Sequence, residues 1–284
     1  MTPARKPRSP GLILVMAAAV AWSTAGLFTR AMTVDTPTIL FWRGVFGGLG
    51  MIAVMLAVGG MRRMGRAGWA YAGLTALSML FFISALRATS VAHVAIITAS
   101  VPFVAAWLGW AVLREVPGRG AVVASVVALI GVAGMVGVRA DGALLGDVLA
   151  GLMALCMAGM ILLSRRYPAI PALPATCAAS LLSALASLPF ATLGGVSAHD
   201  MGLLGLFGVD NQVLGFGLFA LGARLLPPME TALIVALDAP LAPLWVWLVF
   251  AETPATATVM GGSLVLVAVF GHTLRHSALA KRAA

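Results

Sequence analysis

The sequence predicts an all-α integral membrane protein with ten transmembrane helices arranged as two inverted five-helix repeats. Three observations predict this fold: the composition, the length of the apolar segments and an internal repeat. Of the 284 residues, 61% are hydrophobic and 10% are charged, and that composition leaves too few polar side chains for the surface of a soluble protein. We therefore expect the lipid bilayer to be a partner of this chain along almost its whole length.

The ten predicted spans are continuous runs rich in Ala, Leu, Val and Gly. A helix needs about 20 apolar residues to cross a bilayer core of about 30 Å. The runs are too long and too uniformly apolar to be the alternating strands of a barrel. The predicted spans are residues 11–29, 37–59, 67–86, 92–112, 119–138, 146–164, 173–193, 200–223, 229–249 and 255–274.

The basic residues lie mainly on one side of this ten-span map. That side consists of the amino terminus and every second loop, and it holds Arg5, Lys6, Arg8, Arg62, Arg63, Arg66, Arg114, Arg119, Arg165, Arg166, Arg224, Arg275, Lys281 and Arg282. The other side holds Arg30, Arg87 and Arg139, and Arg43 lies within a span. This asymmetry predicts that both termini are cytoplasmic. A net charge of +9 that is spread over loops in this way does not indicate a nucleic-acid partner.

The predicted organisation is a basic amino terminus (1–10), a first repeat (11–138), a second repeat (146–274) and a cytoplasmic tail (275–284). The basic start followed by residues 11–27 also fits a cleavable signal peptide. Cleavage would leave nine helices and disrupt the repeat, so we expect the first segment to be a membrane span.

The internal repeat is clearest after the fourth span of each half. Glu115-Val116-Pro117 corresponds to Glu252-Thr253-Pro254 at an offset of 137 residues. Gly11 corresponds to Gly146 and Arg30 to Arg165 at an offset of 135. Because each half has an odd number of spans, the two halves are expected to face opposite sides of the membrane. Inverted repeats of this kind are typical of secondary transporters, in which a central site opens alternately to each side.

Together with Trp22-Ser23-Thr24 in the first span and Pro102 in the fourth, these features resemble the drug/metabolite transporter superfamily and its EamA-type carriers. Within that superfamily, the chain looks most similar to bacterial aromatic amino-acid exporters. The resemblance implies a central substrate cavity lined mainly by the first, third, fourth, sixth, eighth and ninth helices.

Polar side chains within the spans are the candidates for substrate binding, because such groups need a partner, water or a ligand inside a membrane. In an amino-acid carrier, Asp210 or Asp238 would accept the ammonium group, and Asn211, Gln212, Ser78 or His93 would donate to the carboxylate. Trp22, Phe81, Phe82 and Trp107 are candidates for an apolar wall, although packing or lipid contact explains such residues equally well. The candidate substrate-binding residues are Trp22, Ser78, His93, Asp210, Asn211, Gln212, Glu230 and Asp238.

The ninth span places Glu230, Ile234, Asp238, Leu241 and Trp245 at helical spacing, which predicts one shared, inward-looking face. In the repeat, Glu230 corresponds to His93 at the opposite mouth. The two residues are candidates either for gates or for polar helix ends wetted by lipid headgroups.

Other residues are given structural roles. Arg43 is expected to extend to the outer interface, with a charge partner inside the membrane as the alternative. Pro102, Pro240 and Pro243 are expected to kink the fourth and ninth helices. Gly44, Gly48, Gly131, Gly134 and Gly137 are expected to allow close packing, either within a half or between protomers. Cys156 and Cys177 are expected to be small buried residues, and His272 and His276 to form a basic, solvent-facing helix end.

The sequence contains no Gly-x-x-x-x-Gly-Lys-Ser/Thr loop, so a carrier of this kind is expected to be secondary or facilitative, with no cofactor or metal. Midspan carboxylates make proton coupling a hypothesis. An enzyme acting on lipid-linked substrates is a distant alternative, because neither Asp-x-x-Asp nor Gly-x-Ser-x-Gly occurs. Cationic drugs, polyamines or phosphorylated sugars remain alternative substrates. The sequence does not decide the oligomeric state.

Overall fold

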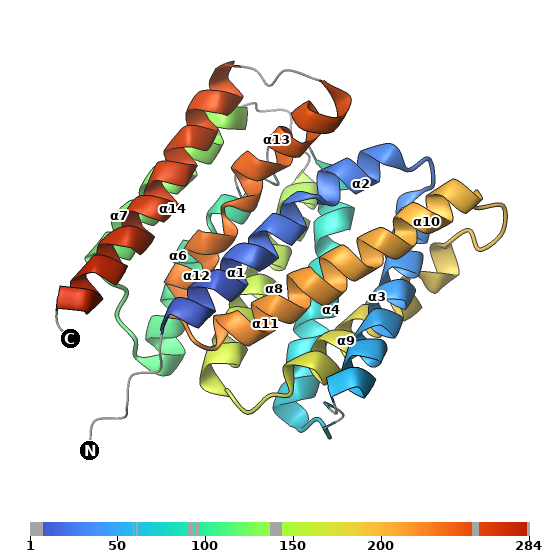
Figure 1. Ribbon diagram of the computed structural model, residues 1–284, viewed down its shortest axis with the longest axis horizontal. Helices are drawn as coiled ribbons and strands as arrows, with labels where there is room; N and C mark the ends of the chain where they lie inside the picture. Colours follow the sequence, from blue (N-terminus) through green and yellow to red (C-terminus); the bar gives the residue numbers. More distant parts are fainter. Residues whose placement is uncertain are drawn as a thin grey trace.

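The computed structural model describes residues 8–58, 60, 62–89, 94, 97–136, 144–251 and 256–282, and every regular element in these ranges is helical (Figure 1). In chain order the helices are α1 (Arg8–Ser23), α2 (Ala25–Ala31), α3 (Thr36–Val58), α4 (Arg66–Ala88), α6 (Val101–Leu108), η1 (Gly109–Leu113), α7 (Arg119–Val136), α8 (Leu144–Arg166), α9 (Ala172–Ser187), η2 (Leu188–Phe190), α10 (Ala198–Phe207), η3 (Gly208–Phe216), α11 (Gly217–Ala223), α12 (Pro228–Val235), α13 (Asp238–Phe250) and α14 (Thr256–Arg282).

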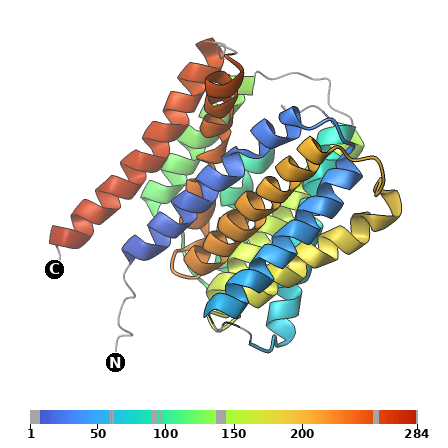
Figure 2. The same cartoon turned by 45° about the vertical axis from the view of Figure 1, so that its right-hand side comes forward.

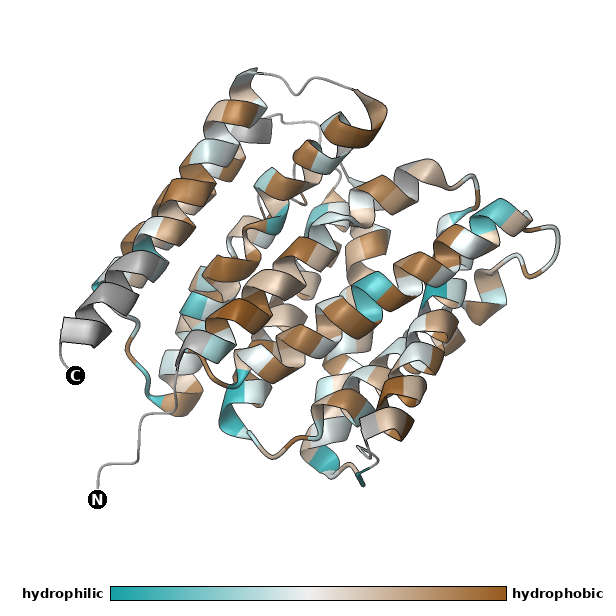
Figure 3. Ribbon diagram, viewed as in Figure 1, coloured by the Kyte–Doolittle hydropathy of each residue, from teal (hydrophilic) through white to brown (hydrophobic). Residues whose placement is uncertain are grey.

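The helices confirm the prediction of an all-helical membrane protein. Within the described residues, eight helices are long and apolar enough to cross a membrane, and two shorter apolar ones cover Ile97–Leu113 and Arg119–Gly134. Each corresponds to one of the ten predicted spans. Large apolar side chains such as Ile13, Leu56 and Val267 are two-thirds exposed on the protein itself, as expected of a surface that contacts lipid. Figure 3 shows hydrophobic residues along the full length of these helices.

The packing relates the two halves by an approximate two-fold symmetry. The second helix of each half packs on its counterpart, α3 on α9, and so does the fifth helix, α7 on α14. Figures 1 and 2 both show α7 and α14 side by side. The packing of α1 on α11 has its counterpart in the packing of α8 on α4. Exchanging the halves therefore reproduces the main contacts, which is the arrangement that an inverted repeat requires.

Gly44 and Gly131 lie at contacts between the two halves, which corrects the expectation about where these glycines pack. A Cβ atom on Gly44 would lie 2.6 Å from the carbonyl oxygen of Ser180, and one on Gly131 would lie 2.7 Å from that of Gly261. Both contacts join the two halves of one chain, whereas the sequence suggested packing within a half or between protomers. Gly134 has no neighbour within 4 Å of such a Cβ, and Gly137 lies outside the described residues.

The repeat register reappears in the contacts of Gly11 and Gly146. Gly11 lies against Leu225 and Leu226 at the end of the eighth span, and Gly146 lies against Ala88 and Thr89 at the end of the third. Each glycine begins the first helix of its half, and each lets that helix approach the end of a helix from the other half. The correspondence of Gly11 with Gly146, read from the sequence, therefore describes equivalent packing positions.

Three spans are interrupted within the residues that the structure describes. The first helix breaks at Thr24, the fourth at Ser100, and the ninth at Ala236 and Leu237. Ser100 and Leu237 are equivalent in the repeat at an offset of 137 residues, so both halves break at the same place. Pro102 and Pro240 follow these breaks and Pro243 lies inside α13, which confirms the expected interruption of the fourth and ninth helices.

The Glu-x-Pro segment after the fourth helix connects the two halves. Glu115 accepts from Arg165 at the end of α8, with Oε1 3.2 Å from Nη2. The contact therefore ties a loop of the first half to the first helix of the second half. The equivalent residues Glu252 and Pro254 lie outside the described residues.

Candidate substrate cavity

Two adjoining cavities lie between the halves, with volumes of about 280 Å³ and about 120 Å³. They share several lining residues, including Trp22, Arg43, Phe82 and Asp238, and together we call them the central cavity. The lining comes from the breaks in the first and ninth helices, from α3, α4, α6, α7 and α8, and from the eighth span. The resemblance implied six of these helices, and the structure adds Arg43 from the second span and Val132 from the fifth.

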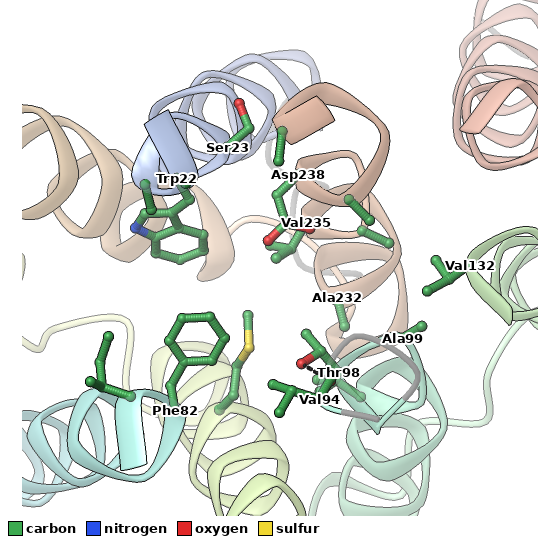
Figure 4. A pocket seen from close by; sticks show the side chains of 18 of the residues that line it. Trp22, Ser23, Phe82, Val94, Thr98, Ala99, Val132, Ala232, Val235 and Asp238 are labelled. Carbon is green, nitrogen blue, oxygen red and sulfur yellow. Dashed lines mark hydrogen bonds between the residues drawn. The ribbon is translucent and has the colours of Figure 1, made fainter. Parts of the chain in front are cut away.

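Most of the lining is apolar. Figure 4 shows Val94, Ala99, Val132, Ala232 and Val235 around the space, with the aromatic rings of Trp22 and Phe82 on facing walls. Such a lining, with a few convergent polar groups, is typical of a pocket for a small organic ligand.

Asp238 provides the negative charge of the central cavity. It occupies the first turn of α13, directly after the break in the ninth helix, and its side chain points into the cavity (Figure 4). The backbone N–H of the next residue, Ala239, donates to the carbonyl oxygen of Ala236 at 3.4 Å. No cationic side chain in the described residues lies within ion-pair distance of Asp238. The break therefore presents a carboxylate to the cavity, and the described residues supply no counter-charge for it.

The same break divides the residues of the predicted face of the ninth span among different surroundings. Glu230 lies in a different cavity, and Ile234 is buried in the core at 2% exposure. Trp245 donates its Nε1–H to Ser23 Oγ at 2.7 Å, so it holds the break in the first helix. The residues of this set lie towards the interior, as their helical spacing predicted, but the break at Ala236 and Leu237 lies between Ile234 and Asp238. Of the set, Asp238 alone lines the central cavity.

Trp22 forms one wall at the end of α1. Its ring packs on Phe216 at a centroid distance of 4.8 Å and on Phe219 at 5.0 Å. Gly215 lies directly against the indole nitrogen, where any side chain would collide with it. The absence of a side chain at position 215 therefore makes room for the tryptophan.

Arg43 does not extend to the outer interface, which was the expectation that the sequence favoured. Its side chain is 5% exposed, lines the central cavity and donates from Nη1 to Asn211 Oδ1 at 3.2 Å. Its guanidinium carbon also lies 5.3 Å from the centroid of the Phe207 ring. Position 43 cannot reach the interface because α3 packs on η3 with this face. Gly47, one turn later, contacts Gln212. That close-packed glycine, on the same helix face as Arg43, was the available signal that the face looks inward.

Asp210, Asn211 and Gln212 are consecutive in the eighth span but lie in three different environments. Asn211 lines the central cavity beside Arg43. Gln212 is fully buried against Gly47 and donates to Met79 Sδ at 3.5 Å, outside the cavity lining. Asp210 accepts from Thr24 Oγ1 at 2.6 Å and is likewise absent from the described lining. The π-helical turns of η3 place these three neighbours on different sides.

The remaining candidates differ in whether they line the central cavity. Ser78 lines the smaller part of the central cavity, and Phe82 lines both parts. Trp107 is 60% exposed on the outer surface, so it is not a wall. His93 lies outside the described residues.

Glu230 lines a separate cavity of about 420 Å³, which we call the end cavity, together with Glu115, Val116 and Pro117. Its Oε1 lies 3.9 Å from Nε2 of His272, whose side chain is only 8% exposed. The expectation that His272 faces solvent was therefore wrong, because α14 turns this side chain towards the start of α12.

Two similar helical halves with a ligand-sized cavity between them are the architecture of a membrane carrier. The sequence matches the EamA-like transporter family over residues 9–137 and again over residues 144–274. The chain belongs to this family of transporters, which lies within the drug/metabolite transporter superfamily.

A solved crystal structure of a protein is similar in fold, with a TM-score of 0.82 at 19% sequence identity. The similarity covers 94% of this chain and 99% of that chain. At this identity, it shows the fold alone. No curated protein sequence gives a significant match.

Proposed function

We propose that this transporter exports amino acids, including bulky or aromatic ones, from the cytoplasm across a bacterial inner membrane. The observation that carries the proposal is the central cavity, where Asp238 offers an acceptor for an ammonium group inside a largely apolar and aromatic lining. Trp22 and Phe82 suit the side chain of a bulky substrate. The distribution of basic residues supports cytoplasmic termini.

Cationic drugs are the second candidate class, because Asp238 and an aromatic wall also suit an organic cation. A substrate panel separates the classes. In proteoliposomes of the purified chain, we expect uptake of radiolabelled phenylalanine that unlabelled amino acids inhibit and cationic dyes do not. Uptake of a cationic dye, without uptake of any amino acid, would refute the amino-acid proposal.

Alternating access is proposed because α6 and α12 run from the central cavity to the end cavity. Thr98, Val101 and Val235 line the central cavity, whereas Ala106 and Met229 line the end cavity. The two helices pack on each other. Their contact therefore separates the two cavities, and opening it would connect the substrate site to the end of the molecule where Glu115 lies.

Thiol labelling tests this mechanism. Cys156 and Cys177 are buried and would first be replaced by alanine, and single cysteines would then be placed at Ala25 in the central cavity and Ala106 in the end cavity. With membrane-impermeant reagents applied from each side, we expect substrate to change the labelling of the two positions in opposite directions. Simultaneous access to Ala25→Cys from both sides would instead indicate a channel.

A further inference from the structure

Arg43 is a buried charge to which the described part of the chain offers no carboxylate partner. Its side chain is 5% exposed, and no Asp or Glu in the described residues lies within ion-pair distance of it. A buried guanidinium is costly unless its charge and its donors are satisfied. The contacts with Asn211 and Phe207 compensate only part of that cost, because an amide oxygen and an aromatic ring carry no full negative charge.

The guanidinium also keeps donors available. Arginine has five N–H donors, and the structure shows one hydrogen bond from them, the Nη1 contact with Asn211. Its Nε is buried and has no acceptor in the described part of the chain. Asn211 therefore fixes one edge of the guanidinium while leaving other donors for a ligand in the cavity.

The charges of the cavity favour one class of ligand. Among the described residues that line the central cavity, Arg43 is the only cation and Asp238 the only carboxylate. Each lines both parts of the cavity, and they are not within ion-pair distance of each other. A ligand with one positive and one negative group satisfies both. A purely cationic ligand would leave Arg43 uncompensated, and a phosphorylated ligand would place its negative charge near Asp238.

We propose that Arg43 binds the carboxylate of a zwitterionic substrate, that Asn211 positions the guanidinium, and that Asp238 binds the ammonium of the same molecule. This inference rests on the proposed amino-acid transport and identifies the group that recognises the carboxylate. The sequence had assigned that role to Ser78, His93, Asn211 or Gln212, of which Asn211 contacts Arg43.

The test compares three labelled compounds with the same ring: phenylalanine, phenethylamine without the carboxylate, and 3-phenylpropionate without the ammonium. Uptake is measured in proteoliposomes of wild type, Arg43→Gln, Arg43→Lys and Asn211→Ala. Arg66→Gln, at the exposed start of α4, is the matched control. Wild type and the control should prefer phenylalanine over both analogues.

We expect Arg43→Gln to lower kcat/KM for phenylalanine by about 10- to 100-fold, the range for losing a hydrogen-bonded charged contact. Its preference for phenylalanine over phenethylamine should disappear, which a general loss of folding would not produce. Arg43→Lys should keep part of that preference, and Asn211→Ala should raise KM. Both variants also keep the test valid if the Gln variant fails to fold.

Two outcomes are distinguishable. If wild type transports phenylalanine and the variants keep its KM and its preference over phenethylamine, the role of Arg43 is wrong and amino-acid transport stands. If wild type transports no amino acid, the proposed function itself fails, whatever the variants show.

Discussion

Asp238→Asn is expected to lower phenylalanine uptake by about 30-fold or more, because removing one partner of a buried charge contact commonly costs 2–5 kcal/mol. The amide keeps the size of the side chain and can still accept a hydrogen bond, but it carries no charge for the ammonium group. It would also leave Arg43 as the only charge in the described cavity lining. The measurement is the initial rate of labelled uptake into proteoliposomes, normalised to the amount of reconstituted protein.

The matched control is Asp35→Asn, an exposed carboxylate before α3, which should leave the rate unchanged. Asp210→Asn is a third and informative variant. Asp210 holds Thr24 at the break in the first helix and does not line the described cavity. If Asp210→Asn abolished uptake while Asp238→Asn did not, the ammonium site would have to be reassigned to Asp210.

Asp238→Asn also tests proton coupling. A carboxylate that releases its proton when substrate binds would couple the two fluxes, and Asp238 is the described residue placed to do so. Under this hypothesis, an imposed pH gradient changes the uptake rate of wild type and has no effect on the residual rate of Asp238→Asn. A wild-type rate that ignores the gradient would leave a facilitated carrier without coupling.

The fold was predictable from the sequence because the membrane simplifies the problem. Backbone groups inside lipid must be paired within the chain, so apolar runs of sufficient length become helices. The alternation of arginines between the two sides supported the number of spans. Gly11 and Gly146, which correspond in the sequence repeat, make equivalent contacts in the structure. These features depend on composition and spacing, which a single sequence contains.

The cavity was only partly predictable, because the face that each helix presents depends on its neighbours. Asp210 and Asn211 are adjacent in sequence, yet η3 directs one to Thr24 and the other to Arg43. The break at Ala236 and Leu237 separated Glu230 from Asp238 despite their helical spacing. Arg43 was treated as an interfacial residue because its burial follows from the packing of α3 on the other half. None of these contacts is encoded in local periodicity.

Gly44→Leu is expected to destabilise the protein by on the order of 3 kcal/mol, the upper range for overpacking a close contact. A Cβ at this position would lie 2.6 Å from the Ser180 carbonyl oxygen and 2.9 Å from the Ala184 Cβ. Neither neighbour can rotate away, because one is backbone and the other is attached directly to it. The helices α3 and α9 would therefore have to separate, and with them the two halves of the chain.

Gly73→Leu in α4 is the matched control, because no atom lies within 4 Å of a Cβ built at that glycine. Thermal unfolding in detergent should show a clearly lower midpoint for Gly44→Leu than for Gly73→Leu. Equal midpoints would mean that the α3–α9 contact adapts easily.

Because α3 and α9 are equivalent helices that meet between the halves, their close contact would restrict the motions of alternating access to those that keep these two backbones together. Gly44→Ala, with a smaller clash, should then lower the transport rate more than it lowers substrate affinity.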